Sequence, residues 1–135
     1  MTLSEIKNTV MFQTNNDEED ISDFLPSLTD YINEAYDRLV FVWAYQHVDE
    51  SNDTYYPLTD DSDEPMTPAW THRYLADWAT WLCYRNGNPQ KQQRGMAYRE
   101  SFLQMLAKIS DMGGINGLNE DGSMKKYKKF INIPR

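Results

Sequence analysis

Residues 67–89 read TPAWTHRYLADWATWLCYRNGNP, and their pattern predicts a helix at the centre of an all-α bundle. Thr67 before Pro68 is a typical cap and first-turn pair, and Asn86-Gly87 is a typical helix end. One side of this helix carries the large side chains of Trp70, Tyr74, Trp78 and Trp81, with Leu75 and Leu82 beside them. The other side carries the small side chains of Ala76, Ala79 and Cys83. A helix that is apolar on two sides packs between neighbours, so we expect this one to be buried.

Another helix follows after a connection of two residues. Asn88-Pro89 repeats the cap and proline pattern, and so short a connection makes the two helices antiparallel neighbours. The expected buried stripe of the second helix consists of Tyr98, Phe102, Met105, Leu106 and Ile109. Its exposed face carries Glu100, Gln104 and Lys108 at i, i+4 spacing, and Gly113-Gly114 predicts its end.

Two more helices are predicted nearer the amino terminus. Thr2-Leu3-Ser4-Glu5 has the spacing of a capping box and begins a short helix that runs to about Gln13. Pro26 suits the first turn of a helix that reaches about Gln46. Its buried stripe is expected to contain Leu25, Leu28, Ile32, Tyr36, Leu39 and Trp43. The opposite face carries Asp30, Glu34 and Asp37, with Phe41 on the same line, and indicates a solvated acidic stripe or a contact surface.

These elements predict one helical domain over residues 1–114, a bundle of about four helices with a long acidic loop, and an extended basic arm over residues 115–135. The length of 135 residues is typical of a single domain, and 40% hydrophobic residues suffice for a modest core. The arm closes with Lys125, Lys126, Tyr127, Lys128, Lys129, Phe130, Ile131 and Ile133. Its large apolar side chains cannot be buried without a partner, so we expect docking on another chain rather than a disordered solubilising tail.

Charge is sorted along the chain. Residues 1–64 hold 16 acidic and 2 basic side chains, and residues 65–135 hold 5 acidic and 11 basic ones, so the net charge of -8 is the sum of -14 and +6. A basic group in the second part comprises Arg85, Lys91, Arg94 and Arg99. Two copies placed head to tail would match an acidic surface to this basic one. The alternatives are neutralisation within one copy and phosphate binding by the basic group.

Composition argues against several classes of function. An acidic chain lacks the broad basic face that clamps nucleic acid. No apolar run approaches the length of a bilayer span, so no membrane contact is expected, and no export signal is readable. The single cysteine, Cys83, excludes an internal disulfide and is expected to behave as a compact apolar group rather than a nucleophile.

Metal-binding and catalytic patterns are weak. Calcium-hand positions are occupied, within the acidic connection 49–64, by Asp49, Ser51, Asp53, Tyr55 and Asp60. The turn glycine is replaced by Thr54, and the last ligand is Asp rather than Glu, which leaves a calcium-dependent sensor or enzyme only as an alternative. His47 and His72 stand alone and are expected at the surface or at helix flanks. We therefore predict no enzyme, no metal site and no cofactor.

Several stretches resemble the adaptor, or head-completion, proteins of tailed bacteriophages. They read FLP (24–26), YINEAYDRL (31–39), PAWTH (68–72), LADWATWL (75–82) and YRNGNPQKQQRG (84–95). The likeness covers roughly residues 2–112 and is one of overall pattern rather than of catalytic fingerprints.

The resemblance implies a small helical subunit that forms a ring, usually dodecameric, beneath the portal protein in the virion neck. Such a ring conducts packaged DNA without sequence-specific binding and offers its other rim to a stopper or tail-completion protein. The carboxy-terminal segment of the family commonly reaches into the portal, which would make residues 125–133 a portal-binding arm. The acidic stripe and the loop 49–64 would be candidates for the lumen wall.

We therefore expect a virion structural protein of the head–tail interface, assembled in the host cytoplasm. The alternative is a small acidic regulatory or inhibitory protein that binds a basic protein partner through the acidic stripe and residues 49–64. The adaptor predicts self-association, whereas the regulator predicts a stable monomer.

Overall fold

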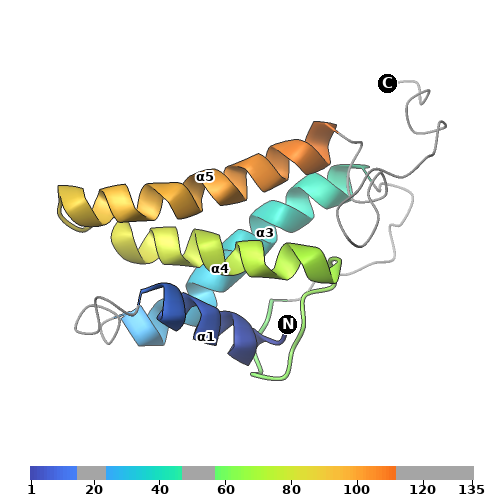
Figure 1. Ribbon diagram of the computed structural model, residues 1–135. Coiled ribbons are helices and arrows are strands. Elements are labelled where there is room, and N and C mark those ends of the chain that lie inside the picture. Colours follow the sequence, from blue (N-terminus) through green and yellow to red (C-terminus); the bar gives the residue numbers. More distant parts are fainter. Residues whose placement is uncertain (15–23, 47–56, 112–135) are drawn as a thin grey trace.

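The computed structural model describes residues 1–14, 24–46 and 57–111 (Figure 1). These residues form α1 (Leu3–Gln13), the 3-10 turn η2 (Leu25–Ser27), α3 (Leu28–Gln46), α4 (Ala69–Tyr84) and α5 (Pro89–Asp111), and no strand occurs among them. The prediction of a small all-α bundle is confirmed. The predicted arm and the predicted helix end at Gly113-Gly114 lie outside the described residues.

α4 is the central helix of the bundle. It packs against α1, α3 and α5, and Figure 1 shows it between α1 and α5 with α3 crossing it. Ala76 and Ala79 are fully buried and Cys83 is nearly so, which lets neighbouring backbones come close. The prediction of a helix buried on two sides is confirmed, although the side chains of Trp70, Tyr74 and Trp81 are only partly buried.

α4 and α5 form the antiparallel hairpin that the sequence predicts (Figure 1). The Oδ1 atom of Asn88 accepts a hydrogen bond from the backbone N–H of Lys91 at 3.0 Å, so Asn88 caps α5. The two helices come very close at Gly95. A Cβ atom placed on Gly95 would lie 2.8 Å from Cε3 of Trp81 and 3.0 Å from Cβ of Tyr84. Glycine is needed here for space.

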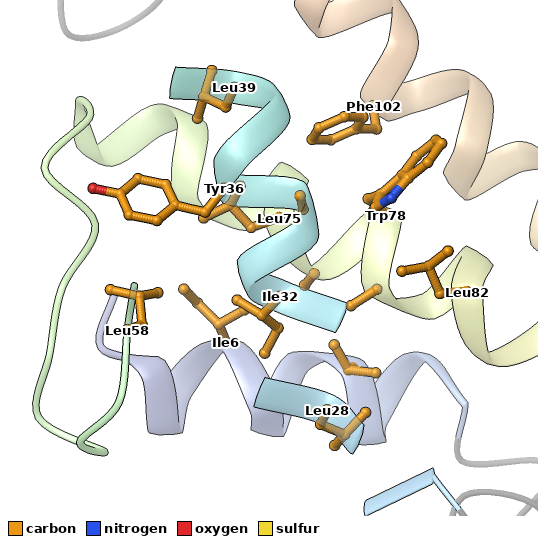
Figure 2. Close-up of a cluster of buried hydrophobic side chains, with 14 of the residues drawn as sticks. Ile6, Leu28, Ile32, Tyr36, Leu39, Leu58, Leu75, Trp78, Leu82 and Phe102 are labelled. Carbon is orange, nitrogen blue, oxygen red and sulfur yellow. The ribbon is translucent and has the colours of Figure 1, made fainter. Parts of the chain in front are cut away.

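The core lies where the four helices meet (Figure 2). Fully buried or nearly so are Ile6 of α1, Leu28, Ile32, Tyr36 and Leu39 of α3, Leu75 of α4 and Phe102 of α5. The rings of Trp78 and Phe102 lie 5.1 Å apart between centroids and join α4 to α5. Each buried Leu, Ile or Phe contributes roughly 1.5–3 kcal/mol, so the apolar stripes hold the helices together.

The connection before α4 is fixed to the bundle at Leu58. The Leu58 side chain is buried in the core. The Asn33 side chain holds the Leu58 backbone, because its Oδ1 accepts from the Leu58 N–H and its Nδ2 donates to the Leu58 carbonyl, both at 2.8 Å. The backbone N–H of Met66 donates to the Tyr36 hydroxyl at 2.8 Å. Figure 2 shows this hydroxyl directed out of the core toward the connection.

α1 also holds this connection. The backbone N–H of Leu3 donates to the carbonyl of Asp63 at 2.7 Å, and that of Ser4 donates to the carbonyl of Asp61 at 3.1 Å. The sequence predicts a long acidic loop over residues 49–64, and the described part, residues 57–64, is irregular as expected. Side-chain and backbone hydrogen bonds tie this part to α1 and α3, which the sequence does not reveal.

Two helix starts differ from the prediction. Pro26 lies in η2, and the α-helical periodicity begins at Leu28. Leu25 is therefore 47% exposed instead of joining the buried stripe, because a 3-10 turn rotates each residue by about 120° rather than 100°. α4 begins with Pro68 at the cap position, and the Thr71 hydroxyl donates to the Thr67 hydroxyl at 2.8 Å. The side chain of Trp43 lies outside the described residues.

Candidate functional site

Residues of opposite charge lie in the chain segments before and after α4. Figure 1 shows that these segments adjoin opposite ends of the helix. The acidic loop, comprising Asp60, Asp61, Asp63 and Glu64, lies before its first turn. The basic tip, comprising Arg85, Lys91 and Arg94, lies after its last turn. The 16 residues of α4 separate the two by about 24 Å at 1.5 Å per residue. Both groups complement the helix dipole, which favours acids near the amino end of a helix and bases near the carboxyl end.

Asp63 gives the acidic loop its shape. Its carboxylate accepts hydrogen bonds from the backbone N–H groups of Thr59 and Asp60, both at 2.9 Å. These hydrogen bonds to the charged form hold the pKa of Asp63 below its ordinary value. Asp63 is therefore a structural residue.

The other three carboxylates of the acidic loop face solvent. Asp60 is exposed, and the side chains of Asp61 and Glu64 are 72% and 60% exposed. Lys7 lies 3.1 Å from Asp61, and the amino group of Met1 lies 3.6 Å from Glu64. Because surface ion pairs of this kind are weak, the loop still presents negative charge to a partner.

The basic tip contains three of the four basic residues that the sequence groups together. Arg85 and Arg94 are exposed and Lys91 is partly buried. No Asp or Glu occurs between residues 85 and 99. Arg99 lies apart, with its guanidinium 5.9 Å from the centroid of the Trp81 ring and 3.2 Å from the Glu100 carboxylate. Arg99 therefore supports the α4–α5 packing.

The three carboxylates of the acidic stripe on α3 also differ in exposure. Asp30 and Asp37 are exposed. Glu34 is partly buried and accepts a hydrogen bond from Nε1 of Trp78 at 3.3 Å, with Arg38 at 3.8 Å. The guanidinium of Arg38 also lies 4.7 Å from the centroid of the Trp78 ring. Glu34 is thus part of the bundle, and only two of the three predicted carboxylates face outward.

A polar network that the sequence analysis missed joins α1, α4 and α5. The Asp77 carboxylate accepts hydrogen bonds from Nε2 of Gln13 and from the Ser101 hydroxyl, both at 2.9 Å. Oε1 of Gln13 accepts in turn from the Thr80 hydroxyl at 2.5 Å. Burial raises the pKa of Asp77 despite these donors. The only sign of this network in the sequence is Asp77, the lone carboxylate of α4. The side chains that donate to Asp77 lie more than 20 residues away in the sequence.

His72 is buried, so the prediction of a surface or helix-flank histidine is wrong. Its ring lies 2.8 Å from the Thr67 carbonyl through Nε2 and 2.9 Å from the amino group of Met1 through Nδ1. The ring belongs to the face of α4 that packs against the chain before the helix, which the isolated spacing of histidines does not reveal. Burial lowers the pKa of His72 and favours the neutral ring.

The described residues contain little that suggests catalysis. Burial raises the pKa of the Cys83 thiol to about 12, which disfavours a thiolate nucleophile at neutral pH. No group of three or more His, Cys, Asp or Glu within 1–14, 24–46 and 57–111 is placed to hold a metal ion. Asp60 is the single calcium-hand position among the described residues, and the arm over 125–133 lies outside them. No helix in this part of the chain is long and apolar enough to cross a bilayer.

The fold and these surfaces define a small helical domain with opposite charges at the two ends of its central helix. Comparison of the chain with protein-family models, with curated proteins and with solved structures gave no match. The resemblance to phage adaptor proteins therefore stays a prediction, resting on the sequence stretches quoted above.

Proposed function

We propose that the protein is a virion structural protein, a head–tail adaptor whose copies form a ring beneath the portal. The observation that carries this proposal is the placement of the basic tip and the acidic loop at opposite ends of one helix. If the basic tip of each copy contacts the acidic loop of the next, a closed ring uses both ends of every copy. Such complementary charges fix the register of neighbours and steer their encounter.

Other surfaces receive roles from the same arrangement. The exposed carboxylates of Asp30 and Asp37 on α3 would face the lumen, where negative charge lets DNA pass without adhering. Residues 125–133 would bind the portal protein. The opposite rim would receive a stopper or tail-completion protein. No step of this function requires an enzyme or a cofactor.

A charge-exchange experiment tests the ring contact. In one variant, Arg85→Glu with Arg94→Glu makes the tip acidic, and in the other, Asp60→Lys with Glu64→Lys makes the loop basic. Each variant alone brings like charges together, so we expect its self-association to weaken by about tenfold or more. An equimolar mixture restores opposite charges at every contact and should form rings with an even number of copies. Native mass spectrometry at low salt measures both outcomes.

The matched control changes two carboxylates away from the ends of α4. Asp30→Lys with Asp37→Lys alters the net charge as much as the loop variant does, yet should leave ring formation intact. Assembly of either end variant alone would contradict the contact. A wild-type chain that stays monomeric at low salt would contradict the ring and favour the acidic regulatory protein.

A further inference from the structure

A groove of about 440 Å³ opens between α4 and α5, near the start of α4. Its apolar walls are formed by Trp70, Tyr74 and Met105, and Arg73 and Lys108 line it as well. The rings of Trp70 and Tyr74 meet edge to face, with centroids 6.3 Å apart at an angle of 84°. Both rings are only partly buried. This volume suits a small ligand or a few side chains.

The two cations of the groove are held on aromatic faces. The guanidinium carbon of Arg73 lies 4.8 Å from the centroid of the Tyr74 ring, and the group donates to the Tyr74 hydroxyl at 2.9 Å. Nζ of Lys108 lies 5.8 Å from the centroid of the Trp70 ring. An aromatic face attracts a cation without cancelling its charge. Two positive charges are therefore positioned at the groove in advance of any ligand.

These charges lack a carboxylate partner among the described residues. Neither Arg73 nor Lys108 forms an ion pair there, and no described Asp or Glu lines the groove. Asp77 attracts Arg73, but its carboxylate is hydrogen-bonded to the network described above. Met1 also lines the groove, and its amino group lies 3.6 Å from Glu64. Within the described residues, the groove thus combines an apolar wall with two cations that form no ion pair.

We propose that this groove binds a short segment of a partner protein in which an Asp or Glu stands beside a large apolar side chain. The carboxylate would lie between Arg73 and Lys108, and the apolar side chain would pack on Trp70 and Tyr74. Hydrogen bonds to charged groups of this kind strengthen binding appreciably. The site lies beside the acidic loop, but its lining includes none of the loop's carboxylates and it needs no second copy of the chain.

The surroundings of the groove favour protein over nucleic acid. Glu64 of the acidic loop approaches Met1 at the groove edge. A nucleic acid gains its affinity from many contacts between phosphates and cations. Its backbone would continue beyond Arg73 and Lys108 and meet the negative charge of the acidic loop. A peptide segment with one Asp or Glu would place its carboxylate within the groove, and this carboxylate would not reach the acidic loop.

Fluorescence anisotropy with labelled peptides tests the site on the full chain. The probes are peptides in which Phe or Leu stands one to three residues from an Asp, with matched sets that carry Asn for Asp or Ala for the apolar residue. We expect the Asp peptides to bind and each matched set to bind about tenfold more weakly. Arg73→Gln with Lys108→Gln should weaken binding of the Asp peptides by about the same factor, which corresponds to 1.4 kcal/mol.

The control variant, Arg85→Gln with Arg94→Gln, removes the same charge at the basic tip and should leave peptide binding unchanged. Circular dichroism verifies that both variants fold, and Trp70→Phe, which keeps an aromatic wall, should retain binding. Equal binding of Asp and Asn peptides, equal losses in the two double variants, or no peptide binding up to about 1 mM would overturn the proposal. Tighter binding of a short oligothymidylate than of any peptide would overturn it in favour of nucleic acid.

Discussion

The hydrogen bonds of His72 assign its tautomer. The Thr67 carbonyl can only accept, so Nε2 of His72 carries the proton and donates to it at 2.8 Å. Nδ1 is then the acceptor for the amino group of Met1 at 2.9 Å. A protonated ring would have to bring a positive charge into a buried position beside another one. The folded protein therefore resists protonation of His72, in agreement with its lowered pKa.

The first prediction concerns the pH dependence that follows from this burial. A histidine whose folded pKa is lowered contributes stability above the unfolded value of about 6.5, and this stability is lost as pH falls through the folded pKa. Wild-type protein should therefore lose free energy of unfolding between pH 7.5 and pH 5, and His72→Gln should show a flatter dependence. At pH 7.5 the variant should be less stable by about 1–2 kcal/mol because the bond to Thr67 is weakened. Urea unfolding across this range measures both effects.

The chain supplies a matched control in its other histidine. His47→Gln should retain the pH dependence of the wild type, since His72 is still present. If the free energy of unfolding fell equally with pH in the wild type and in His72→Gln, burial of His72 would not be the cause of the loss of stability at acid pH.

At the contact between α4 and α5, two opposing effects determine how Gly95→Ala would change the stability. Ala is favoured over Gly within a helix by about 1 kcal/mol. A Cβ at Gly95, however, would lie 2.8 Å from the Trp81 ring and 3.0 Å from Cβ of Tyr84. Overpacking of this kind costs typically 1–3 kcal/mol. We predict that Gly95→Ala lowers the stability by about 1 kcal/mol, measured as a change in urea midpoint at constant m-value.

A double-mutant cycle distinguishes the clash from other causes. In a Trp81→Ala background the nearest obstacle is gone and only Cβ of Tyr84, at 3.0 Å, remains, so the cost of Gly95→Ala should fall toward zero. The same destabilisation in both backgrounds would show that the Trp81 ring is not the obstacle. Gly87→Ala is a poor control, because a Cβ there would also lie 2.8 Å from a side-chain atom of Lys91.

Local signals predicted the helices well, because caps and periodicity are written in adjacent residues. The capping box of Thr2 and Glu5 is present, α1 ends at Gln13 and α3 ends at Gln46, as predicted. The contact between Asn33 and Leu58 was not predictable, because it joins a side chain to a backbone 25 residues away without any periodic signature. The close approach at Gly95 is likewise a property of two packed helices and not of either sequence alone.

The sequence shows which charged residues could form a surface, but not where each of them lies in the fold. The sorting of charge along the chain predicted complementary acidic and basic surfaces, but not that the acidic loop and the basic tip lie at opposite ends of α4. Glu34 and Arg99 count as charges in the sequence, yet both are engaged by tryptophan side chains of the bundle. The groove beside Trp70 was missed because its aromatic walls follow the same periodicity as a core stripe.

The proposed contacts of the whole molecule fall in two parts of the chain. The acidic loop and the basic tip lie within residues 60–94, whereas the proposed portal-binding arm comprises residues 125–133. Self-association and portal binding should therefore be separable by truncation, which a single shared surface would not allow.

A truncated variant that lacks residues 123–135 tests this separation. On the proposed function, the truncated chain should form rings at low salt, because both ends of α4 are intact, and should lose binding to the portal protein. Native mass spectrometry measures the first property and a surface binding assay the second. A full-length variant with Tyr127→Ser and Phe130→Ser keeps all four lysines and should also lose binding, because the apolar side chains need a partner to be buried. Unaltered portal binding by the truncation would refute the arm, and loss of ring formation would make the arm part of the contact between subunits.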